Sequence, residues 1–185
     1  MNFMGYRRPD GKAGIRNKVL ILPTCVCSSE TCRIVADQVE GAIYTSNQAG
    51  CSEVEQNLKI CYDMYSGFAA NPNIYGTVLI GLGCEGCTPD KMADAIREKT
   101  NKPLAVVVIQ DEGGTVNAIN KAVKYAREFV QEASLVQKEE IPLSELFIGL
   151  ECGGSDATSG LAANPVVGKV SDLVVDNGGS AVMSE

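Results

Sequence analysis

Cysteine is the reactive side chain that this sequence uses most, and histidine is absent. The lack of histidine removes the commonest general base and the commonest neutral metal ligand. Thiolates bind zinc, iron and iron–sulfur clusters, so the composition favours metal binding. Burial as a small apolar side chain is the alternative, and it is favoured for Cys25, Cys32 and Cys61. The eight cysteines are Cys25, Cys27, Cys32, Cys51, Cys61, Cys84, Cys87 and Cys152.

A second stretch that could carry chemistry is the polar loop of residues 151–165. An apolar run ends at Glu151 and Cys152, and two glycines and several small hydroxyl or carboxylate side chains follow. Glycine lets the backbone approach a ligand closely, and free N–H groups at the start of the next helix favour an anion. We therefore predict a ligand site in this loop.

Short apolar runs alternate with amphipathic stretches along the whole chain. This alternation predicts an α/β fold, a three-layer doubly wound, mostly parallel sheet of about six strands with helices on both faces. No linker or repeat interrupts it, so residues 1–185 are expected to form one domain. The chain ends directly after its last predicted strand, as half of a longer domain would. Strands are predicted at residues 18–24, 42–45, 76–82, 104–109, 146–150 and 180–183, and helices from about residues 28, 53, 88, 115 and 165.

The predicted fold brings cysteines that are distant in sequence together. Parallel strands end at one edge of their sheet, so the loops with Cys51, Cys84 and Cys152 are expected to meet in one crevice. The pair Cys84-x-x-Cys87 is also compatible with a redox dithiol or a zinc site. The glycine pattern of residues 81–86 resembles a dinucleotide-binding turn, but it follows the third strand rather than the first.

Charge and hydropathy narrow the function classes. A net charge of −7 argues against nucleic-acid binding, which uses basic surfaces. No apolar run approaches the ~20 residues that a membrane helix needs, so a cytoplasmic protein is expected. Among the arginines before the first strand, Arg16 is a candidate for binding a substrate carboxylate. Arg7 and Arg8 are predicted to be solvated surface charges.

Several motifs together resemble the altronate/galactarate dehydratase family. Residues 102–146 are also similar to the large subunit of the sulfolactate sulfo-lyases. The resemblance implies a metal-dependent lyase, with iron or manganese, that eliminates water or sulfite from a small hydroxy acid. It also implies a missing C-terminal half or a partner chain, and the exposed last strand favours pairing, for example in a homo-oligomer. The motifs are Tyr6-Arg-Arg-x-x-Gly-x-x-Gly-Ile-Arg-Asn17, Asn71-Pro-Asn73, Gly81-Leu-Gly-Cys-Glu85, Leu143-Ser-Glu-Leu146, Cys152-Gly-Gly-Ser-Asp156 and Ala163-Asn-Pro165.

The resemblance also suggests roles for individual residues. Asn47 stands where the family usually has a histidine, and Asp156 is a candidate base in its place. A divalent metal is expected, with an iron–sulfur cluster as the alternative. A non-catalytic module that binds a metal or ligand is the alternative function. The candidate metal ligands are Cys51, Cys84, Glu85 and Cys152, and the candidate substrate-binding residues are Arg16, Asn17, Gly153, Gly154, Ser155 and Asn164.

Overall fold

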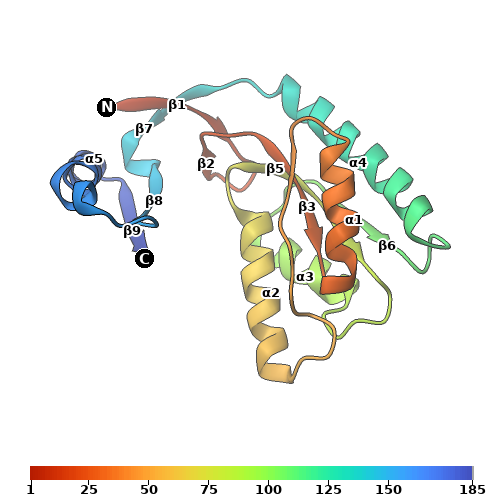
Figure 1. The fold of residues 1–185 in the computed structure, drawn as a ribbon. Coiled ribbons are helices and arrows are strands. Elements are labelled where there is room, and N and C mark those ends of the chain that lie inside the picture. The colour runs from red at the N-terminus through yellow and green to blue at the C-terminus, as the bar shows by residue number, and fades with distance from the viewer. Residues whose placement is uncertain (185) are drawn as a thin grey trace. The chain divides into compact units, whose positions relative to one another are not determined.

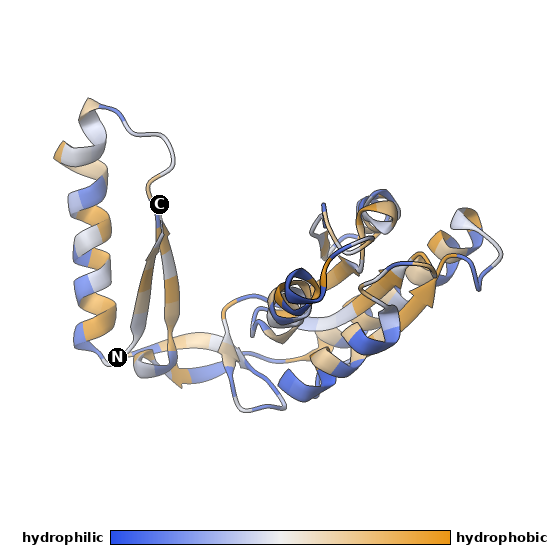
Figure 2. Ribbon diagram, turned by 90° about the horizontal axis from the view of Figure 1, so that it is seen from below, coloured by the Kyte–Doolittle hydropathy of each residue, from blue (hydrophilic) through white to orange (hydrophobic). Residues whose placement is uncertain are grey.

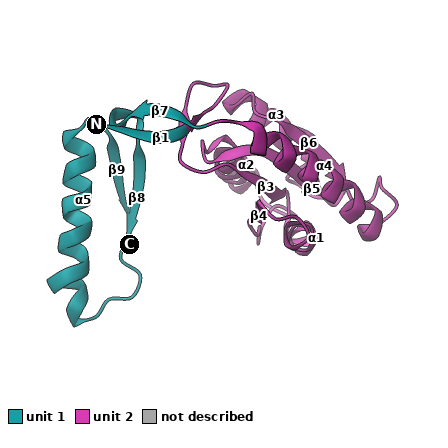
Figure 3. Cartoon of the chain, turned by 90° about the horizontal axis from the view of Figure 1, so that it is seen from above, with its two compact units in different colours: residues 1–5, 138–185 teal, residues 6–137 magenta. Residues whose placement is uncertain are grey.

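The computed structural model describes residues 1–184 and contains two compact units (Figure 3). Unit 2 is Tyr6–Gln137, and unit 1 combines Met1–Gly5 with Lys138–Glu185. The sequence analysis treated the chain as one domain because its strands and helices alternate without an obvious linker. The division arises because the last two strands pair with each other and not with the larger sheet.

Unit 2 is built on a four-stranded parallel sheet in the order β4-β3-β5-β6 (Figure 1). Its apolar strands are short, and the residues of β3 and β5 are almost all buried. Such continuous burial is typical of parallel strands that are covered on both faces. The strands are β3 (Lys18–Pro23), β4 (Ala42–Tyr44), β5 (Ile74–Gly81) and β6 (Leu104–Val108).

Helices cover both faces of this sheet, as the sequence predicted. Successive side chains of a strand point to opposite faces, so Val19 and Ile21 pack with α1 and α4, whereas Leu20 and Leu22 pack with α2 and α3. Two apolar cores therefore lie on either side of β3. The helices are α1 (Val26–Asp37), α2 (Glu55–Ala70), α3 (Pro89–Lys99) and α4 (Thr115–Leu135).

Unit 1 contains two small sheets and one long helix. In this unit the first residues of β1 (Asn2–Arg7) pair antiparallel with β7 (Glu139–Pro142). β8 (Phe147–Glu151) and β9 (Ser180–Ser184) form a parallel pair, connected through a π-helical turn, Ser159–Ala163, and α5 (Asn164–Asp176). Apolar and polar turns alternate along α5 (Figure 2), and only Val174 of this helix is buried.

The three-layer parallel architecture is confirmed for unit 2, but the expected size of the sheet is wrong. All six predicted strands exist, yet only four share the main sheet, because β8 and β9 pair separately. The sequence analysis also missed β1, β2 (Ala13–Gly14) and β7. β2 and β7 are short, and β1 and β7 are partly polar and pair with each other across most of the chain, so no local periodicity indicates them.

Candidate site at the carboxyl edge of the sheet

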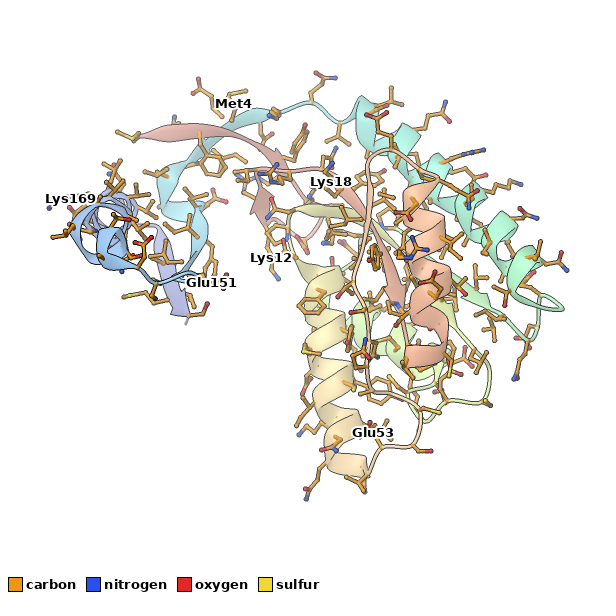
Figure 4. All side chains as sticks on the ribbon, in the orientation of Figure 1. Met4, Lys12, Lys18, Glu53, Glu151 and Lys169 are labelled. Atoms are coloured by element: carbon orange, nitrogen blue, oxygen red, sulfur yellow. The ribbon has the colours of Figure 1, made fainter. Side chains whose placement is uncertain are left out.

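The strand order places a topological switch point between β3 and β5. From β3 the chain moves outward to β4 and then returns to β5 on the other side of β3. Open α/β sheets bind ligands beyond the strand ends at such a point. Three segments lie there, and we call them the carboxyl-edge loops: residues 24–27, which include the first two residues of α1, and residues 45–54 and 82–88. Figure 4 labels Lys18 at the start of β3 and Glu53 in the second of these loops.

Backbone hydrogen bonds hold the carboxyl-edge loops together. The Gly86 N–H donates to the Cys51 carbonyl oxygen at 2.9 Å, and the Cys87 N–H donates to the Gly50 carbonyl oxygen at 2.8 Å. The Val26 N–H donates to the Ala49 carbonyl oxygen at 3.1 Å. The second loop therefore bridges the other two, and all three form one continuous edge.

Three exposed thiols lie on this edge, one on each loop: Cys27, Cys51 and Cys84. The pKa of the Cys27 thiol is raised, chiefly by the neighbouring Cys25 thiol, and further by partial desolvation and by Cys51 and Cys84. The loops that carry these thiols are adjacent, as their backbone hydrogen bonds show, and the convergence of the thiols on one ligand stays a prediction. Cys27 was missing from the predicted ligands, although its position directly after a strand gave the same signal as that of Cys51 and Cys84.

Asn47, a candidate catalytic residue, is buried in the second loop and holds it in shape. Its side-chain amide donates to the Thr24 carbonyl oxygen at 2.9 Å, and its side-chain oxygen accepts from the Ala49 N–H at 2.9 Å. Its backbone N–H donates to the Ser29 hydroxyl at 2.9 Å. Both polar atoms of the side chain are therefore engaged in the loop, and a catalytic role for Asn47 stays a prediction.

Glu85, a candidate metal ligand, is likewise buried and bonded internally. One carboxylate oxygen accepts from the Thr24 hydroxyl at 2.5 Å and the Leu82 N–H at 2.8 Å, and the other accepts from the Gly83 N–H at 2.6 Å. Burial raises the pKa of this carboxyl, but these hydrogen bonds outweigh burial, and the pKa is lowered overall. The contacts give Glu85 a structural function in the third loop, and its assignment as a ligand stays a prediction.

Replacing Glu85 by glutamine is expected to lower the free energy of unfolding by about 2 kcal/mol at neutral pH, because one acceptor oxygen becomes an NH2 donor that faces an N–H. The folded-state pKa of Glu85 is lowered. Its stabilisation is therefore complete above the unfolded-state pKa and is lost as the pH falls through the folded-state value. Urea unfolding at pH 7 and pH 3 should show a smaller difference between the two proteins at pH 3. An equal difference in the free energy of unfolding at both pH values would contradict stabilisation by the ionised Glu85 carboxylate.

The glycines of residues 81–86 are explained by packing within the loop. A Cβ at Gly81 would lie 2.2 Å from the Pro89 ring, and one at Gly83 would lie 2.7 Å from the Gln110 side chain. A Cβ at Gly86 would lie 3.0 Å from the Cys51 carbonyl oxygen. Close packing against the protein itself accounts for these positions, so the glycine pattern gives no support to dinucleotide binding.

The residues present do not form a site for one metal ion. Within residues 1–184, no three His, Cys, Asp or Glu side chains lie close enough together to hold one. A cavity of about 240 Å³ opens beside Glu85, and its lining includes Asp90 from the first turn of α3 and Asp111 from the loop after β6. The carboxyl edge therefore has a cavity of small-molecule size with carboxylates in its lining, and no cysteine lines it.

The loop of residues 151–165 belongs to unit 1 and has its own cavity of about 350 Å³, lined by Cys152 and Asn164 among others. The Asn164 amide lies 3.7 Å from the Cys152 sulfur, and the Ser155 hydroxyl lies 3.6 Å from it. The residues of this loop are almost all exposed, including Gly153 and Gly154. Because Cys152 follows a strand of another sheet, its predicted place beside Cys51 and Cys84 stays a prediction.

Asp156 caps the helical turn that follows it. Its carboxylate accepts from the Thr158 hydroxyl at 2.6 Å and from the Thr158 and Ser159 N–H groups at 2.7 and 3.0 Å. These hydrogen bonds, led by that from the Thr158 side chain, lower the pKa of Asp156. An N-cap carboxylate with a lowered pKa is a weak base, so catalysis by Asp156 stays a prediction that needs this cap to open.

The arginine motif lies at the opposite, amino edge of the sheet. Arg16 and Asn17 precede β3, whereas the carboxyl-edge loops follow it, roughly 20 Å away along six residues. Arg8 is buried, so its prediction as a solvated charge is wrong. Its guanidinium donates to the carbonyl oxygens of Pro72 and Arg16 and to the Asn17 side chain at 2.6–2.7 Å. Unit 2 does not bring Arg16 or Asn17 to the thiols.

Lys102 is buried beside Arg8 and has an ammonium–carbonyl hydrogen bond of 2.6 Å to Asn71. Burial lowers its pKa to about 7. Because the folded-state pKa is below the unfolded-state value of about 10.4, stability is expected to rise between pH 7 and pH 10, as the unfolded state binds more protons. Relative to Lys102→Met, the native protein should gain about 2 kcal/mol over this range in urea unfolding. A difference in the free energy of unfolding that did not change with pH would contradict a lowered pKa for the buried Lys102 amine.

Comparison with known proteins agrees with this arrangement. Residues 5–134 match the family described as "D-galactarate dehydratase/Altronate hydrolase, second domain", and residues 143–185 match "D-galactarate/Altronate dehydratase, C-terminal". This chain belongs to the D-galactarate dehydratase/altronate hydrolase family. The boundary between the two matches falls near the boundary between units 2 and 1. The family resemblance read from the sequence motifs is therefore confirmed.

The curated relatives have two kinds of named activity. The chain is 37% identical over 183 residues to the (2R)-sulfolactate sulfo-lyase subunit beta of Chromohalobacter salexigens, covering 99% of this chain and 46% of that protein. It is 31% identical over 193 residues to the altronate dehydratase of Bacillus subtilis, covering 99% of this chain and 38% of that protein. The altronate dehydratase of Escherichia coli is 30% identical over 190 residues, covering 97% and 38%. The chain thus spans less than half the length of these family members.

In this chain, several of the family motifs form hydrogen bonds that order the loops at the amino and carboxyl edges of the sheet. The arginine and Asn71-Pro-Asn73 motifs meet at the amino edge, where the Asn73 side chain accepts from the Ile15 and Arg16 N–H groups. Gly81-Leu-Gly-Cys-Glu85 forms the third carboxyl-edge loop. None of the described helices is both long and apolar enough to cross a membrane.

Proposed function

We propose that this chain supplies part of the active site of a hydro-lyase that removes water from a sugar acid such as altronate or galactarate. The observation that carries the proposal is the match of both its units to dehydratase family domains. The thiol-bearing edge at the switch point and the polar loop of unit 1 are the regions that we assign to substrate and cofactor binding. Iron or manganese remains the proposed metal, and other parts of the enzyme would have to contribute ligands, because no three ligating side chains lie close together within residues 1–184.

The proposed reaction is an elimination without net oxidation. A base removes the proton α to the carboxylate, the electron pair of that C–H bond forms a carbon–carbon double bond, and the β-hydroxyl leaves with its bonding pair. The proton and the hydroxide together make one water molecule. A metal ion, if bound, would supply a Lewis acid for the carboxylate and the leaving hydroxyl. This chain contains no histidine, so the proton acceptor is a carboxylate such as Asp156 or a residue of another part of the enzyme.

A sulfite-eliminating lyase is the second candidate, and the 37% identity to a sulfolactate sulfo-lyase subunit beta favours it. Such a protein would act with a partner subunit. Unit 1 supports a partner surface, because Leu161, Phe147 and Met183 are 84%, 64% and 81% exposed. These exposed apolar side chains are the candidates for contact with such a partner.

The two candidates differ in the product that they release. The polypeptide that contains this chain should be incubated with altronate, galactarate and (2R)-sulfolactate in the presence of ferrous iron. A 2-keto-3-deoxy acid from either sugar acid supports the hydro-lyase, and sulfite from sulfolactate supports the second candidate. Absence of both products, with the fold intact by circular dichroism, would refute the proposed lyase function and favour a binding module.

A further inference from the structure

The outer side of α2 carries a row of exposed apolar side chains. Ile60, Met64 and Phe68 recur every fourth residue along this helix, and all three are exposed. Residues with this spacing lie on one face of a helix. Asn57 and Asn71 extend the same face at its two ends, and both are uncharged. Single apolar side chains are common on protein surfaces, but a continuous row marks a surface that makes contacts.

The row continues onto β4, the edge strand of the four-stranded sheet. Ile43 and Tyr44 of this strand are also exposed, and with Phe68 they line a hollow of about 310 Å³. The Tyr65 ring contacts the Phe68 ring edge-on at 5.6 Å between centroids, which fixes the position of Phe68. We define the α2–β4 patch as Ile43, Tyr44, Ile60, Met64 and Phe68.

The composition and charge of the α2–β4 patch favour a second copy of this chain as its partner. Methionine and aromatic residues are enriched at the centre of protein interfaces, and charged residues are depleted there. The net charge of −7 opposes association of two copies through most of their surface. Contact through the uncharged patch keeps the acidic side chains of the two copies apart.

The area of the patch is sufficient for a symmetric pair. Its residues are 40–62% exposed, and side chains of this size have roughly 200 Å² of accessible surface each. A symmetric pair uses the same patch on both copies, so it would bury on the order of 1,000 Å² in total, which is the lower limit for a specific interface.

We propose that the α2–β4 patch joins two copies of this chain about a two-fold axis that passes beside Met64. Met64 is the middle residue of the row on α2, so the axis brings it against Met64 of the second copy. Ile60 of each copy then lies near Phe68 of the other. The flexible methionine side chain can adapt to an identical neighbour. This inference does not rest on the proposed lyase function.

The test is the mass of this chain in solution, measured by sedimentation equilibrium over a wide range of concentration. We expect the mass of a dimer for the native chain. Met64→Glu should raise the dissociation constant by roughly a hundredfold, because two carboxylates would meet at the axis. Val116→Glu is the matched control, because Val116 is an exposed apolar residue on α4 of the same unit, and this variant should stay dimeric. Circular dichroism should show that both variants fold, since both side chains are exposed.

A second measurement identifies the partner as another copy. Met64→Lys alone should be as weakly associated as Met64→Glu alone, whereas an equal mixture of the two should form a heterodimer, because opposite charges then meet at the axis.

Several outcomes would overturn the inference. A monomeric native chain would do so and would leave the patch to another part of the enzyme. A dimer that persists in Met64→Glu, or that is lost equally in Val116→Glu, would also contradict it. Loss of the dimer in Leu161→Glu but not in Met64→Glu would place the interface in unit 1. Failure of the two Met64 variants to associate when mixed would contradict the two-fold axis at this residue.

Discussion

Replacing Gly50 by alanine is expected to lower the free energy of unfolding by about 3 kcal/mol and to separate the carboxyl-edge loops. Gly50 has a φ of +89°, and an added Cβ would lie 2.2 Å from the Thr24 carbonyl oxygen. That oxygen also accepts the Asn47 amide hydrogen bond, and the Gly50 carbonyl accepts the Cys87 N–H. The second loop must therefore move away from both neighbours. Urea unfolding measures the loss of stability.

Gly67→Ala is the matched control for this prediction. Gly67 lies within α2, its φ is not positive, and nothing lies within 4 Å of an added Cβ. Alanine there should raise stability by roughly 0.5–1 kcal/mol, because glycine is the poorer helix former. If both alanine variants changed stability equally, the left-handed turn at Gly50 would not be what orders the loops.

Replacing Arg8 by alanine is also expected to lower the free energy of unfolding by about 3 kcal/mol, because three part-buried hydrogen bonds from its charged guanidinium are lost at once. The side chain is 3% exposed and reaches Pro72, Arg16 and Asn17. Arg8→Lys should recover only part of the loss, since one ammonium cannot reproduce a planar fork of donors. Chemical unfolding of both variants measures these effects.

Arg97→Ala serves as the control for Arg8. Arg97 forms an exposed ion pair with Asp94, and such pairs contribute less than about 1 kcal/mol. A loss at Arg8 no larger than that at Arg97 would contradict a structural role for the arginine motif. Full recovery by lysine would show that charge alone, and not the bidentate geometry, holds the amino edge.

The candidate site was predictable in part. Glycine-rich loops with Cys51 and Cys84 directly after apolar strands indicated the carboxyl edge, and the structure brings those loops together. The roles of Asn47 and Glu85 inside the loops were not predictable, because a polar side chain in a loop looks the same in sequence whether it faces a ligand or the backbone. Both side chains form a hydrogen bond with Thr24, and only the folded chain brings Thr24 next to them.

By itself, the sequence determined the family and the α/β class. It also determined where in the chain each strand of the main sheet and each helix on its faces lies. These features depend on local periodicity and on motifs, which the chain order contains in full. Only the tertiary structure decided that β8 and β9 leave the main sheet, that Arg8 is buried, and that the loop of Cys27 is adjacent to those of Cys51 and Cys84. Each of these depends on contacts between residues distant in sequence, and the stabilisation from burial and pairing exists only after the chain has folded.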